Sequence, residues 1–534
     1  MSLPPGLRDA TFRWIADDPD EATRTELQTI LAKAMSGDEN ALEDLRDRMA
    51  GPLTFGTAGL RGPVRAGSNG MNRAVVIRTT AGLANWLTEK GTVYVGRDAR
   101  HGSQDFAEAA AQVLAGAGFD VRLLPRPLPT PVLAFLVRKH NAVAGVQITA
   151  SHNPPADNGY KLYLRGGSQI VPPEDRQIEQ AIAQVPAAVS VPLSTNYRTV
   201  DEEQIDEYLQ RIEQLPTGTA KTLKVALTPM HGVGGQTAVE ALRRAGFTDV
   251  HVVRAQAVPD PEFPTVDFPN PEEPGAADQL LKLAGDIDAD LAIALDPDAD
   301  RCALGVKDAD GWRMLRGDET GVLLGSLVLS TVDRLDPLVA TTIVSSSLLK
   351  SIAAKHGARY AETLTGFKWL VRAGEGLVFA YEEALGNCVD PEYVSDKDGI
   401  SAAVVACDLA AGLKASGRTL LDALDQLATE HGVHLTDQVS QRLTDLSLIG
   451  KVMARLRATP PDDFATEDLL PDADVLRLTA PGVRVIVRPS GTEPKLKAYL
   501  EVVEPVAESL PDAKAKARQR MAELRERVTE LVMP

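Results

Sequence analysis

Three stretches in the middle of the chain share one pattern: a short apolar run, a segment with helical spacing, and a second apolar run. The first two helical segments end in Ala-Gly-Phe and the third in His-Gly-Ala, so each has a glycine where a helix commonly stops. Strands separated by helices predict β-α-β units with mostly parallel sheets, and the repetition predicts three related α/β domains. The predicted strand, helix and strand are residues 93–95, 103–116 and 119–124 in the first unit, 223–227, 235–245 and 250–253 in the second, and 339–344, 347–356 and 360–364 in the third.

The two ends of the chain follow other patterns. Residues 1–50 are acidic, and the helical spacing of their apolar positions predicts a helical arm. Near the other end, residues 483–487 and 496–502 alternate as half-buried strands do, and residues 513–533 have the pattern of a charged amphipathic helix, which together predict an α+β domain. The predicted divisions are the arm over residues 1–50 and four domains over residues 51–215, 216–325, 326–435 and 436–534.

Length and composition limit the possible classes of function. The 534 residues are too many for one core, and the 44% of hydrophobic residues suffice for several. A net charge of −18 argues against a nucleic-acid or membrane-surface partner, so an anionic small molecule would need a local basic pocket. The three cysteines show no Cys-x-x-Cys spacing, which fits a reducing compartment. Because no signal peptide is visible and the longest apolar stretch, residues 320–332, is short for a bilayer, we expect a cytoplasmic protein. We expect a monomer or a homodimer, and the sequence does not choose between them.

The loop that follows the apolar run 142–148 carries the first candidate chemistry. Residues 149–161 read Thr-Ala-Ser-His-Asn-Pro-Pro-Ala-Asp-Asn-Gly-Tyr-Lys. Asn-Pro-Pro prevents a helix and the Asn-Gly pair tolerates positive φ, so a sharp turn is predicted. Ser151, with His152 beside it, would then lie at a strand end, where open α/β sheets bind their ligands, and is a candidate nucleophile. A surface turn with an ordinary hydroxyl is the alternative.

A second loop, Asp-Pro-Asp-Ala-Asp-Arg over residues 296–301, directly follows the apolar run 291–295. Asp296, Asp298 and Asp300 alternate along a predicted turn, and carboxylates packed in this way repel one another unless a cation compensates them. An EF-hand is excluded because its sixth position holds Arg instead of Gly and its twelfth holds Lys instead of Glu. Oxygen ligands of this kind suit Mg²⁺, and three of them leave coordination positions open for a phosphate.

Further stretches carry polar groups at predicted strand ends or turns. Arg-Pro-Ser-Gly-Thr-Glu-Pro-Lys, which starts at Arg488, lies between the two tail strands and could form an anion-binding nest, although a plain hairpin turn is the alternative. Glu382 and Glu383, in Tyr-Glu-Glu-Ala-Leu-Gly, could accept hydrogen bonds from sugar hydroxyls or simply begin a helix, and Lys368 could reach the same ligand. In Phe-Gly-Thr-Ala-Gly-Leu-Arg-Gly, the glycines allow close approach to a ligand and Arg61 could bind a phosphate or carboxylate; an ordinary glycine turn is the alternative.

Together these stretches resemble the α-D-phosphohexomutase superfamily, the phosphoglucomutases and phosphomannomutases, over nearly the whole chain. Thr-Ala-Ser-His-Asn-Pro is similar to the phosphoserine loop, Asp-Pro-Asp-Ala-Asp-Arg to the magnesium loop, Glu-Glu-Ala-Leu-Gly to the sugar-recognition loop, and Arg-Pro-Ser-Gly-Thr-Glu-Pro to the phosphate-binding loop of the last domain. The four motifs occur in the family order. The resemblance implies an isomerase of carbohydrate metabolism, with three α/β domains and a C-terminal α+β domain around a central cleft.

The resemblance also implies a mechanism. Ser151 would carry a phosphoryl group, and one Mg²⁺ per chain would neutralise charge during its transfer. A sugar bisphosphate would be both intermediate and activator, turning end for end before the second phosphate returns to Ser151. Lys161 would need a lowered pKa to act as a base, which the nearby Arg61 and Arg301 could provide. The implied catalytic residues are Arg61, Ser151, His152, Lys161 and Lys368; the metal residues are Ser151, Asp296, Asp298 and Asp300; and the substrate-binding residues are Arg301, Glu382, Glu383, Arg488, Ser490, Gly491 and Thr492.

One departure from the hexose-type pattern bears on the substrate. The sugar loop has Ala384 where hexose-processing members commonly have serine, and a missing hydroxyl changes sugar discrimination. The Glu-Glu-Ala form and the Phe-Gly-Thr-Ala-Gly-Leu-Arg-Gly stretch resemble a longer subgroup that includes phosphopentomutases. We expect interconversion of the 1-phosphate and 6-phosphate of glucose or mannose. The alternatives are a mutase for ribose or deoxyribose 1-phosphate and 5-phosphate and, from another class, a metal-dependent sugar phosphatase.

Overall fold

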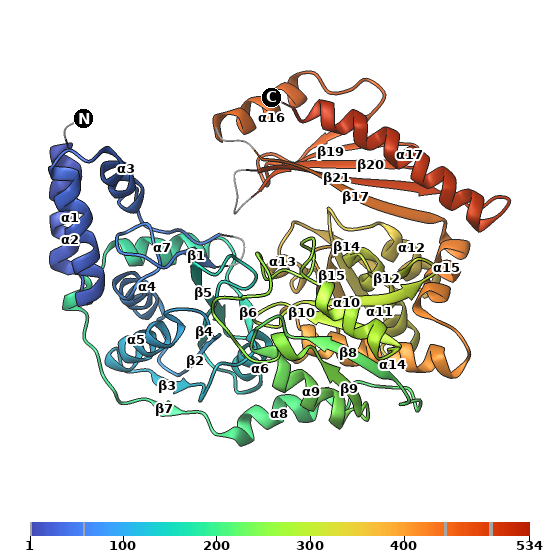
Figure 1. Ribbon diagram of the computed structural model, residues 1–534, viewed down its shortest axis with the longest axis horizontal. Coiled ribbons are helices and arrows are strands. Elements are labelled where there is room, and N and C mark those ends of the chain that lie inside the picture. Colours follow the sequence, from blue (N-terminus) through green and yellow to red (C-terminus); the bar gives the residue numbers. More distant parts are fainter. Residues whose placement is uncertain (1–2, 57–58, 443–445, 491–494, 534) are drawn as a thin grey trace. The chain divides into compact units, whose positions relative to one another are not determined.

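The structure is a computed structural model that describes residues 3–56, 59–442, 446–490 and 495–533 (Figure 1). The chain divides into two compact units. One unit comprises Met1–Met314 together with Asp390–Asp408, and the other comprises Leu315–Val389 together with Leu409–Pro534. A short segment in the middle of the third predicted domain therefore belongs with the first two domains.

Three helices form the N-terminal arm. They are α1 (Pro5–Asp17), α2 (Glu21–Met35) and α3 (Glu39–Arg48). Asp20 and Asp38 cap α2 and α3, since their side chains accept hydrogen bonds from Ala22 N and Ala41 N. Leucines at helical spacing, such as Leu27 and Leu31, form a small core between the three helices.

The first large sheet has the strand order β1-β5-β4-β2-β3-β7, with β6 paired to β5. Its central strands β4, β2 and β3 are parallel, while β5 runs antiparallel to β4 and to β1. The strands are β1 (Leu60–Pro63), β2 (Thr92–Arg97), β3 (Asp120–Leu123), β4 (Ala144–Ile148), β5 (Asp157–Leu164), β6 (Ser168–Gln169) and β7 (Arg198–Thr199). The helices that follow them are α4 (Arg73–Trp86), α5 (Ser103–Gly116), α6 (Thr130–Lys139), α7 (Glu174–Ala183) and α8 (Glu202–Ile212).

Two further sheets repeat the central part of this topology. The order β5-β4-β2-β3 of the first sheet returns as β11-β10-β8-β9 in the second and as β16-β15-β13-β14 in the third. The second domain contains β8 (Lys224–Thr228), α9 (Gly234–Arg244), β9 (Asp249–Val252), α10 (Asp278–Asp286), β10 (Leu291–Leu295), β11 (Cys302–Asp308) and β12 (Gly311–Met314). The third contains α11 (Gly317–Thr331), β13 (Leu338–Thr342), α12 (Leu348–Lys355), β14 (Arg359–Thr363), α13 (Phe367–Leu370), β15 (Leu377–Glu382) and β16 (Gly386–Cys388). The prediction of three related α/β domains with mixed sheets is confirmed.

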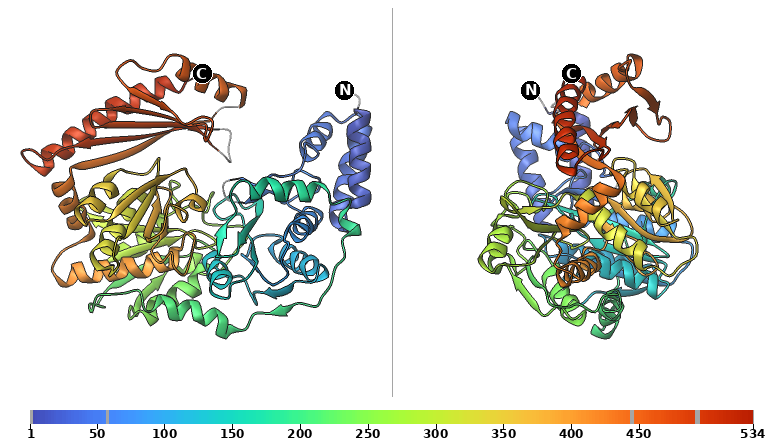
Figure 2. Two further views of the ribbon diagram at one scale, coloured as in Figure 1. Left: turned by 180° about the vertical axis from the view of Figure 1, so that it is seen from behind. Right: turned by 90° about the vertical axis from the view of Figure 1, so that its right-hand side faces the viewer.

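The last domain has a different architecture. Its antiparallel sheet has the order β17-β21-β20-β19-β18, and α17 lies along β17 and β21 on one face, as both views of Figure 2 show. The strands are β17 (Val433–Arg442), β18 (Ala465–Asp468), β19 (Leu476–Ala480), β20 (Val483–Pro489) and β21 (Lys495–Glu504), and the helices are α16 (Leu446–Ala458) and α17 (Leu510–Leu531). Alternate residues of the strands pack under α17, as the period of two in the sequence predicts. The predicted α+β domain is confirmed.

Two of the predicted domain boundaries need correction. The boundary at residues 325/326 falls inside α11, because the apolar stretch there is a buried helix that packs on β15 and not a linker. The boundary at residues 435/436 falls inside β17, which pairs with β21 along its whole length. The corresponding junctions therefore lie before Leu315 and before Val433.

Two helices connect the third domain with the last. They are α14 (Gly399–Ala415) and α15 (Leu420–His431), which meet at an angle of 88°. Among the described residues no single helix is long and apolar enough to cross a membrane, and this bent pair meets the length and hydropathy requirement only when its two helices are taken together.

Candidate active site

Three loops that carry candidate chemistry occupy the same place in the three repeated domains. Each connects a parallel strand to the antiparallel strand beside it: β4 to β5, β10 to β11, and β15 to β16. Each also contains one non-glycine residue in the left-handed region, Ser151 (φ 53°), Ala299 (φ 55°) and Leu385 (φ 66°). Such residues cost energy and persist where the surrounding structure enforces them, which is typical of functional sites.

Ser151 lies in the first of these loops, only 1% exposed. Its backbone N–H donates to Thr149 Oγ1 over 2.9 Å, which stabilises the turn immediately after β4. The sharp turn is therefore at the serine itself and not at Asn158-Gly159, as the sequence suggested, because both of those residues belong to β5. Gly159 is needed for another reason: a Cβ there would lie 2.6 Å from the carbonyl oxygens of Leu60 and Thr149.

The second loop buries three carboxylates completely. Asp296, Asp298 and Asp300 are 0% exposed, and each offers an oxygen within 4.8 Å of the others. Oδ1 of Asp298 and Oδ1 of Asp300 are buried and accept no hydrogen bond in the part of the chain that the structure describes. Buried carboxylate oxygens without a donor are costly unless they bind a cation, so this donor set fits a hard divalent ion such as Mg²⁺.

The serine and the carboxylates form one cluster. Ser151 Oγ donates a hydrogen bond to Asp296 Oδ2 over 2.9 Å, although the two residues are 145 positions apart in the chain. The other oxygen of Asp296 accepts from the backbone N–H of Arg301 over 3.1 Å. Burial, followed by the charges of Asp300 and Asp298, raises the pKa of Asp296 well above its usual range. Positive charge near this cluster therefore favours ionisation of Asp296.

Two buried lysines and a threonine hold the outer oxygens of the carboxylates. Lys161 Nζ donates to Asp298 Oδ2 over 2.6 Å and to Asp300 Oδ2 over 2.7 Å. Lys397 Nζ lies 3.2 Å from the same oxygen of Asp300, and Thr130 Oγ1 donates to Asp298 Oδ2 over 2.5 Å. Each of Asp298 and Asp300 thus has one oxygen bonded to the chain and one left for a cation.

The pKa of Lys161 differs from the sequence-based expectation. Burial lowers it, but the carboxylates of Asp298 and Asp300 outweigh burial, so the pKa of Lys161 is raised. The expected lowering was wrong because the sequence showed the neighbouring arginines but not the two carboxylates in direct contact. In this arrangement Lys161 is a proton donor and a counter-charge.

A basic group lies on the other side of the Ser151 loop. Arg301 Nη1 donates to His152 Nδ1 over 2.7 Å, and Arg61 Nη1 donates to Asn153 Oδ1 over 2.8 Å. Burial, with the charges of Arg301 and Arg61, lowers the pKa of His152 well below its usual range, so the imidazole is neutral and accepts from Arg301. Two guanidinium groups that contact the two residues after Ser151 give this loop a local positive charge in an acidic protein.

The third loop, in the other compact unit, positions two carboxylates at the end of β15. Glu383 Oε2 accepts hydrogen bonds from Thr342 Oγ1 and Ser345 Oγ, each over 3.1 Å, and Glu383 N donates to Ser345 Oγ over 3.1 Å. Glu382 is 8% exposed. A Cβ on Gly317 would lie 1.8 Å from the carbonyl oxygen of Glu383, so only glycine allows α11 to start so close to the loop.

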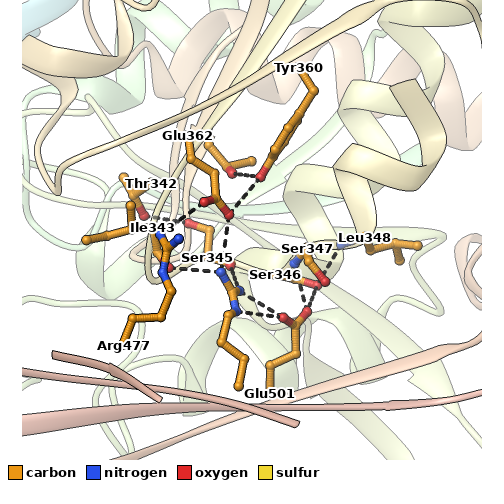
Figure 3. A network of polar contacts seen from close by, with 12 residues as sticks. Thr342, Ile343, Ser345, Ser346, Ser347, Leu348, Tyr360, Glu362, Arg477 and Glu501 are labelled. Atoms are coloured by element: carbon orange, nitrogen blue, oxygen red, sulfur yellow. Dashed lines mark hydrogen bonds and ion pairs between the residues drawn. The ribbon is translucent and has the colours of Figure 1, made fainter. Parts of the chain in front are cut away.

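A polar network joins the loop after β13 to the sheet of the last domain (Figure 3). Glu501 accepts hydrogen bonds from Ser346 Oγ over 2.8 Å and from Ser347 N over 2.7 Å, and Figure 3 shows these side by side. Arg484 pairs with Glu501 over 2.8 Å and donates to the carbonyl oxygens of Ile343, over 3.0 Å, and Ser345. Ser345 therefore contacts the last domain through its carbonyl group and Glu383 through its hydroxyl.

The electrostatics of this network favour an ionised Glu501. Burial raises its pKa, but the hydrogen bond from His434 and the charge of Arg484 outweigh burial and hold the pKa at about 2. Apolar contacts reinforce the junction, because Ile343 and Val344 pack against Ile486.

The remaining predicted residues lie in the unit that contains the third and last domains. Lys368 is in α13, with its Nζ 6.0 Å from the centre of the Trp369 ring. Arg488 is near the end of β20, and Ser490 N donates to Lys495 O over 2.8 Å where β20 leads to β21. Gly491 and Thr492 lie outside the described residues.

Sequence reasoning missed several residues of the cluster. Thr130 and Lys397 were not predicted to contact the carboxylates, and Arg100 was not predicted to bind the backbone of the Ser151 loop. A usable signal existed for Arg100, because it follows β2 in Gly-Arg-Asp-Ala-Arg, at the strand end where ligands are expected. No local signal identified Thr130, which begins α6 after Pro-Leu-Pro.

The fold and the acidic cluster define a multidomain α/β enzyme with a candidate metal site beside a buried serine. Comparison with family models gives the family. Four models match in order: phosphoglucomutase/phosphomannomutase alpha/beta/alpha domain I over residues 52–188, domain II over 206–311, domain III over 316–431, and the C-terminal domain over 439–517. The chain belongs to the phosphoglucomutase/phosphomannomutase family and is an isomerase-type phosphosugar mutase.

Curated relatives span three named activities. A probable phosphomannomutase of Haemophilus influenzae is 44% identical over 452 residues, covering 81% of this chain and 93% of that protein. A phosphoglucomutase of Staphylococcus aureus is 34% identical, covering 86% of this chain and 91% of that protein. A human phosphopentomutase is 33% identical, covering 95% of this chain and 93% of that protein.

Solved structures share the fold. A putative phosphomannomutase from Thermus thermophilus has a TM-score of 0.69 at 24% identity and covers 88% of this chain and 99% of its own. A phosphoglucomutase/phosphomannomutase family protein from Burkholderia thailandensis has a TM-score of 0.70 at 20% identity and covers 89% of this chain and 97% of its own.

Proposed function

We propose that this protein interconverts the 1-phosphate and 6-phosphate of a hexose, glucose or mannose, through a phosphoserine at Ser151 and a hexose bisphosphate. The observation that carries the proposal is the hydrogen bond of 2.9 Å between Ser151 Oγ and Asp296 Oδ2, inside a cluster with two unbonded carboxylate oxygens. The 44% identity to a probable phosphomannomutase supports a hexose as substrate.

The reaction consists of two phosphoryl transfers. In the first, a bond forms between phosphorus and a sugar hydroxyl oxygen, the bond from phosphorus to Ser151 Oγ breaks, and the hydroxyl proton passes to a base. In the second, after the bisphosphate has turned end for end, a bond forms between Ser151 Oγ and the phosphorus of the opposite phosphate. The bond from that phosphorus to the sugar oxygen breaks, and the sugar oxygen takes up a proton. Lys161 holds its proton beside the carboxylates and would supply it to an oxygen that leaves phosphorus. Lys368, in α13, is the candidate base of the third domain.

Asp296, Asp298 and Asp300 would hold one Mg²⁺, with an oxygen of Ser151 as a further ligand. When bound, Mg²⁺ supplies charge neutralisation for the phosphoryl group in transit. Thr130 and Lys161 orient Asp298 and Asp300, because they bond to one oxygen of each carboxylate and would leave the other oxygen to bind the cation.

The substrate contacts come from four places in the chain. Arg301 and Arg61 flank the Ser151 loop and would bind the transferred phosphate. Glu382 and Glu383 would accept hydrogen bonds from sugar hydroxyls, and Ser345 and Thr342 orient the carboxylate of Glu383 for this task. By the family resemblance, Arg488, Ser490, Gly491 and Thr492 would bind the phosphate that is not reacting.

Two alternatives have observations in their favour. A pentose mutase is supported by the human phosphopentomutase, whose similarity covers 95% of this chain, and by Ala384 in the sugar loop. A metal-dependent sugar phosphatase would use the same serine and carboxylates and release the phosphoryl group to water. It is disfavoured because hydrolysis has no use for a second phosphate-binding domain.

Coupled assays on the phosphates of glucose, mannose, ribose and deoxyribose, with and without a catalytic amount of bisphosphate, distinguish these functions. We expect isomerised hexose phosphate, activation by bisphosphate, and little inorganic phosphate. A pentose activity far above the hexose activities would favour the first alternative. Release of inorganic phosphate in step with turnover would favour the second.

Two variants test the named residues. Ser151→Ala should retain ligand binding and lose turnover, because the acceptor oxygen is gone. Asp298→Asn should weaken Mg²⁺ binding in a calorimetric titration, and Asp308→Asn, which changes a carboxylate outside the cluster, is the matched control. Full turnover of Ser151→Ala, or an unchanged titration of Asp298→Asn, would contradict the assignment.

A further inference from the structure

The loop that carries Ser151 is wrapped around one guanidinium group. Arg100, between β2 and α5, donates from Nη2 to the carbonyl oxygens of Ser151, over 2.7 Å, and Asn153, over 2.6 Å. From Nη1 it donates to the carbonyl oxygens of Pro154, over 2.8 Å, and Asp157, over 3.1 Å. The side chain of Arg100 thus satisfies four carbonyl groups of a loop whose two ends are the strands β4 and β5.

Arg100 is itself held on two sides. Its Nε lies 3.4 Å from Asp98 Oδ2, and Asp98 Oδ1 accepts hydrogen bonds from Arg100 N over 2.9 Å and Ser103 Oγ over 2.5 Å. The ring of Phe263, from the long connection before α10, covers the guanidinium, with Cζ 4.9 Å from the ring centre. Arg100 is 4% exposed and Phe263 is 2% exposed, so neither side chain has room for a second orientation.

This arrangement explains how Ser151 can keep its unusual backbone. Four carbonyl oxygens that converge on one point repel one another, and a buried loop of this shape needs a donor for each. A non-glycine residue with φ of 53° is strained and persists only when its surroundings enforce it. The rigid fork of a guanidinium supplies the donors in fixed directions, which an ammonium cannot do.

We propose that Arg100 is a positioning residue for phosphoryl transfer: it holds the loop in the one conformation that directs Ser151 Oγ at Asp296, and Phe263 restrains Arg100 from the second domain. The inference rests on the proposed function, since it concerns how Ser151 accepts a phosphoryl group. It goes further in assigning this task to a side chain that binds the backbone of the Ser151 loop and makes no hydrogen bond to the three carboxylates in the part of the chain that the structure describes. Asp296, by contrast, is held by the second domain without help from Arg100.

The test is a single-turnover measurement of phosphoryl transfer from glucose 1,6-bisphosphate to Ser151, followed by intact mass. The variants are Arg100→Lys, Arg100→Ala and, as matched control, Arg122→Lys, which changes an arginine of the same domain whose ion pair is with Asp120 on its own strand. We expect both Arg100 variants to load Ser151 about 100-fold more slowly or worse, as a displacement of the order of 1 Å does to reacting groups. The control should stay within about twofold, the variation normal for a surface substitution.

Two further readouts separate positioning from a general loss of structure. Mn²⁺ should still bind to Arg100→Lys with an affinity within about tenfold of wild type, because the three carboxylate ligands belong to the second domain and Arg100 bonds to none of them. Methylguanidine should raise the rate at which Arg100→Ala is phosphorylated on Ser151 by at least about tenfold, whereas urea, which has a similar shape but no charge, should leave that rate unchanged. If Arg100→Ala does not fold, Phe263→Leu replaces it, with a smaller loss expected because the guanidinium is still present.

The outcomes distinguish the inference from the function on which it rests. Wild-type protein that acquires phosphate while Arg100→Lys loads at the same rate overturns the inference alone. Methylguanidine and urea that raise the loading rate of Arg100→Ala equally also overturn it. If Arg100→Ala does not fold, a Phe263→Leu variant that is loaded at the wild-type rate overturns it instead. Wild-type protein that never acquires phosphate on Ser151 overturns the proposed function together with the inference.

Discussion

Replacing Lys161 by methionine should destabilise the metal-free protein and, at the same time, increase its affinity for Mg²⁺. The Lys161 ammonium is 1% exposed and lies 2.6 Å from Asp298 and 2.7 Å from Asp300. Methionine has nearly the same length and packing volume, so the change removes the charge with little effect on shape. Two buried carboxylates then lose their nearest counter-ion, and Asp300 keeps the more distant Lys397 at 3.2 Å.

The size of both effects follows from this geometry. Removing one partner of a buried ion pair costs about 3–5 kcal/mol, because the remaining charge is buried and unpaired. For a unit of this size that corresponds to a fall in Tm of roughly 5–10 °C in EDTA. A cation present at about 100 times its Kd stabilises the folded state by about 2.7 kcal/mol. If the variant has a lower Kd than wild type, the same Mg²⁺ concentration stabilises the variant by more. Since the cluster has lost one positive charge, we expect Mg²⁺ to bind at least about tenfold more tightly.

The assay compares thermal unfolding in EDTA and in a series of Mg²⁺ concentrations, with Mg²⁺ affinity measured by calorimetry. Lys307→Met is the matched control, because its ion pair with Asp288 is exposed and such pairs contribute about 0–1 kcal/mol. The reasoning would be refuted by a Lys161→Met protein whose Tm in EDTA equals that of wild type. It would also be refuted by Mg²⁺ raising the Tm of both proteins by the same amount.

Three further predictions concern other parts of the molecule. Glu501→Gln should lower the free energy of unfolding by about 3 kcal/mol at pH 7, because the pKa of Glu501 is about 2 in the folded protein and near 4.3 in the unfolded chain. The difference from wild type should shrink as the pH falls from about 4 to 2, since Glu501 becomes protonated over that range. Denaturation experiments in which the difference does not change with pH would contradict this. Gly159→Ala should lower the free energy of unfolding by about 1–3 kcal/mol and slow phosphoryl loading of Ser151, because its Cβ would lie 2.6 Å from two carbonyl oxygens. Gly450→Ala is the control: a Cβ there meets nothing within 4 Å, so the change should leave stability the same or increase it. Ser345→Ala should raise KM for sugar phosphate by roughly tenfold, with a smaller effect on kcat, because each hydrogen bond between Ser345 and Glu383 contributes about 1–2 kcal/mol. Unchanged KM and kcat would show that Ser345 does not orient Glu383 for the substrate.

The repeated topology gives the loops before each helix a common role. In the first domain Arg100 binds the Ser151 loop, in the second Val233 N donates to Pro297 O over 2.8 Å, and in the third Ser345 binds Glu383. In each case a loop at the end of β2, β8 or β13 supports the neighbouring loop that carries the candidate chemistry. The support is of a different chemical kind each time, so no shared motif reveals it in the sequence.

Much of the fold follows from local patterns. The helix predicted over residues 103–116 is α5, Ser103–Gly116, and the apolar run 291–295 is β10, Leu291–Leu295. Periodicity and glycine stops suffice in such cases because burial and backbone geometry act over a few residues. The same reasoning placed a domain boundary inside α11, because a buried helix that is apolar on all sides has no amphipathic period to identify it.

By itself the sequence determined the order of the elements, the repeat of three α/β domains, and which serine and which carboxylates are candidates for the chemistry, since these depend on residue types within short segments. Only the tertiary structure decided that Lys161 contacts Asp298 and Asp300, that Thr130 orients Asp298, and that four carbonyl groups of the Ser151 loop meet at Arg100. Charge and hydrogen bonding act across space, so the pKa of Lys161 and the conformation of Ser151 depend on partners far away in the chain. Local spacing contains no information about those partners.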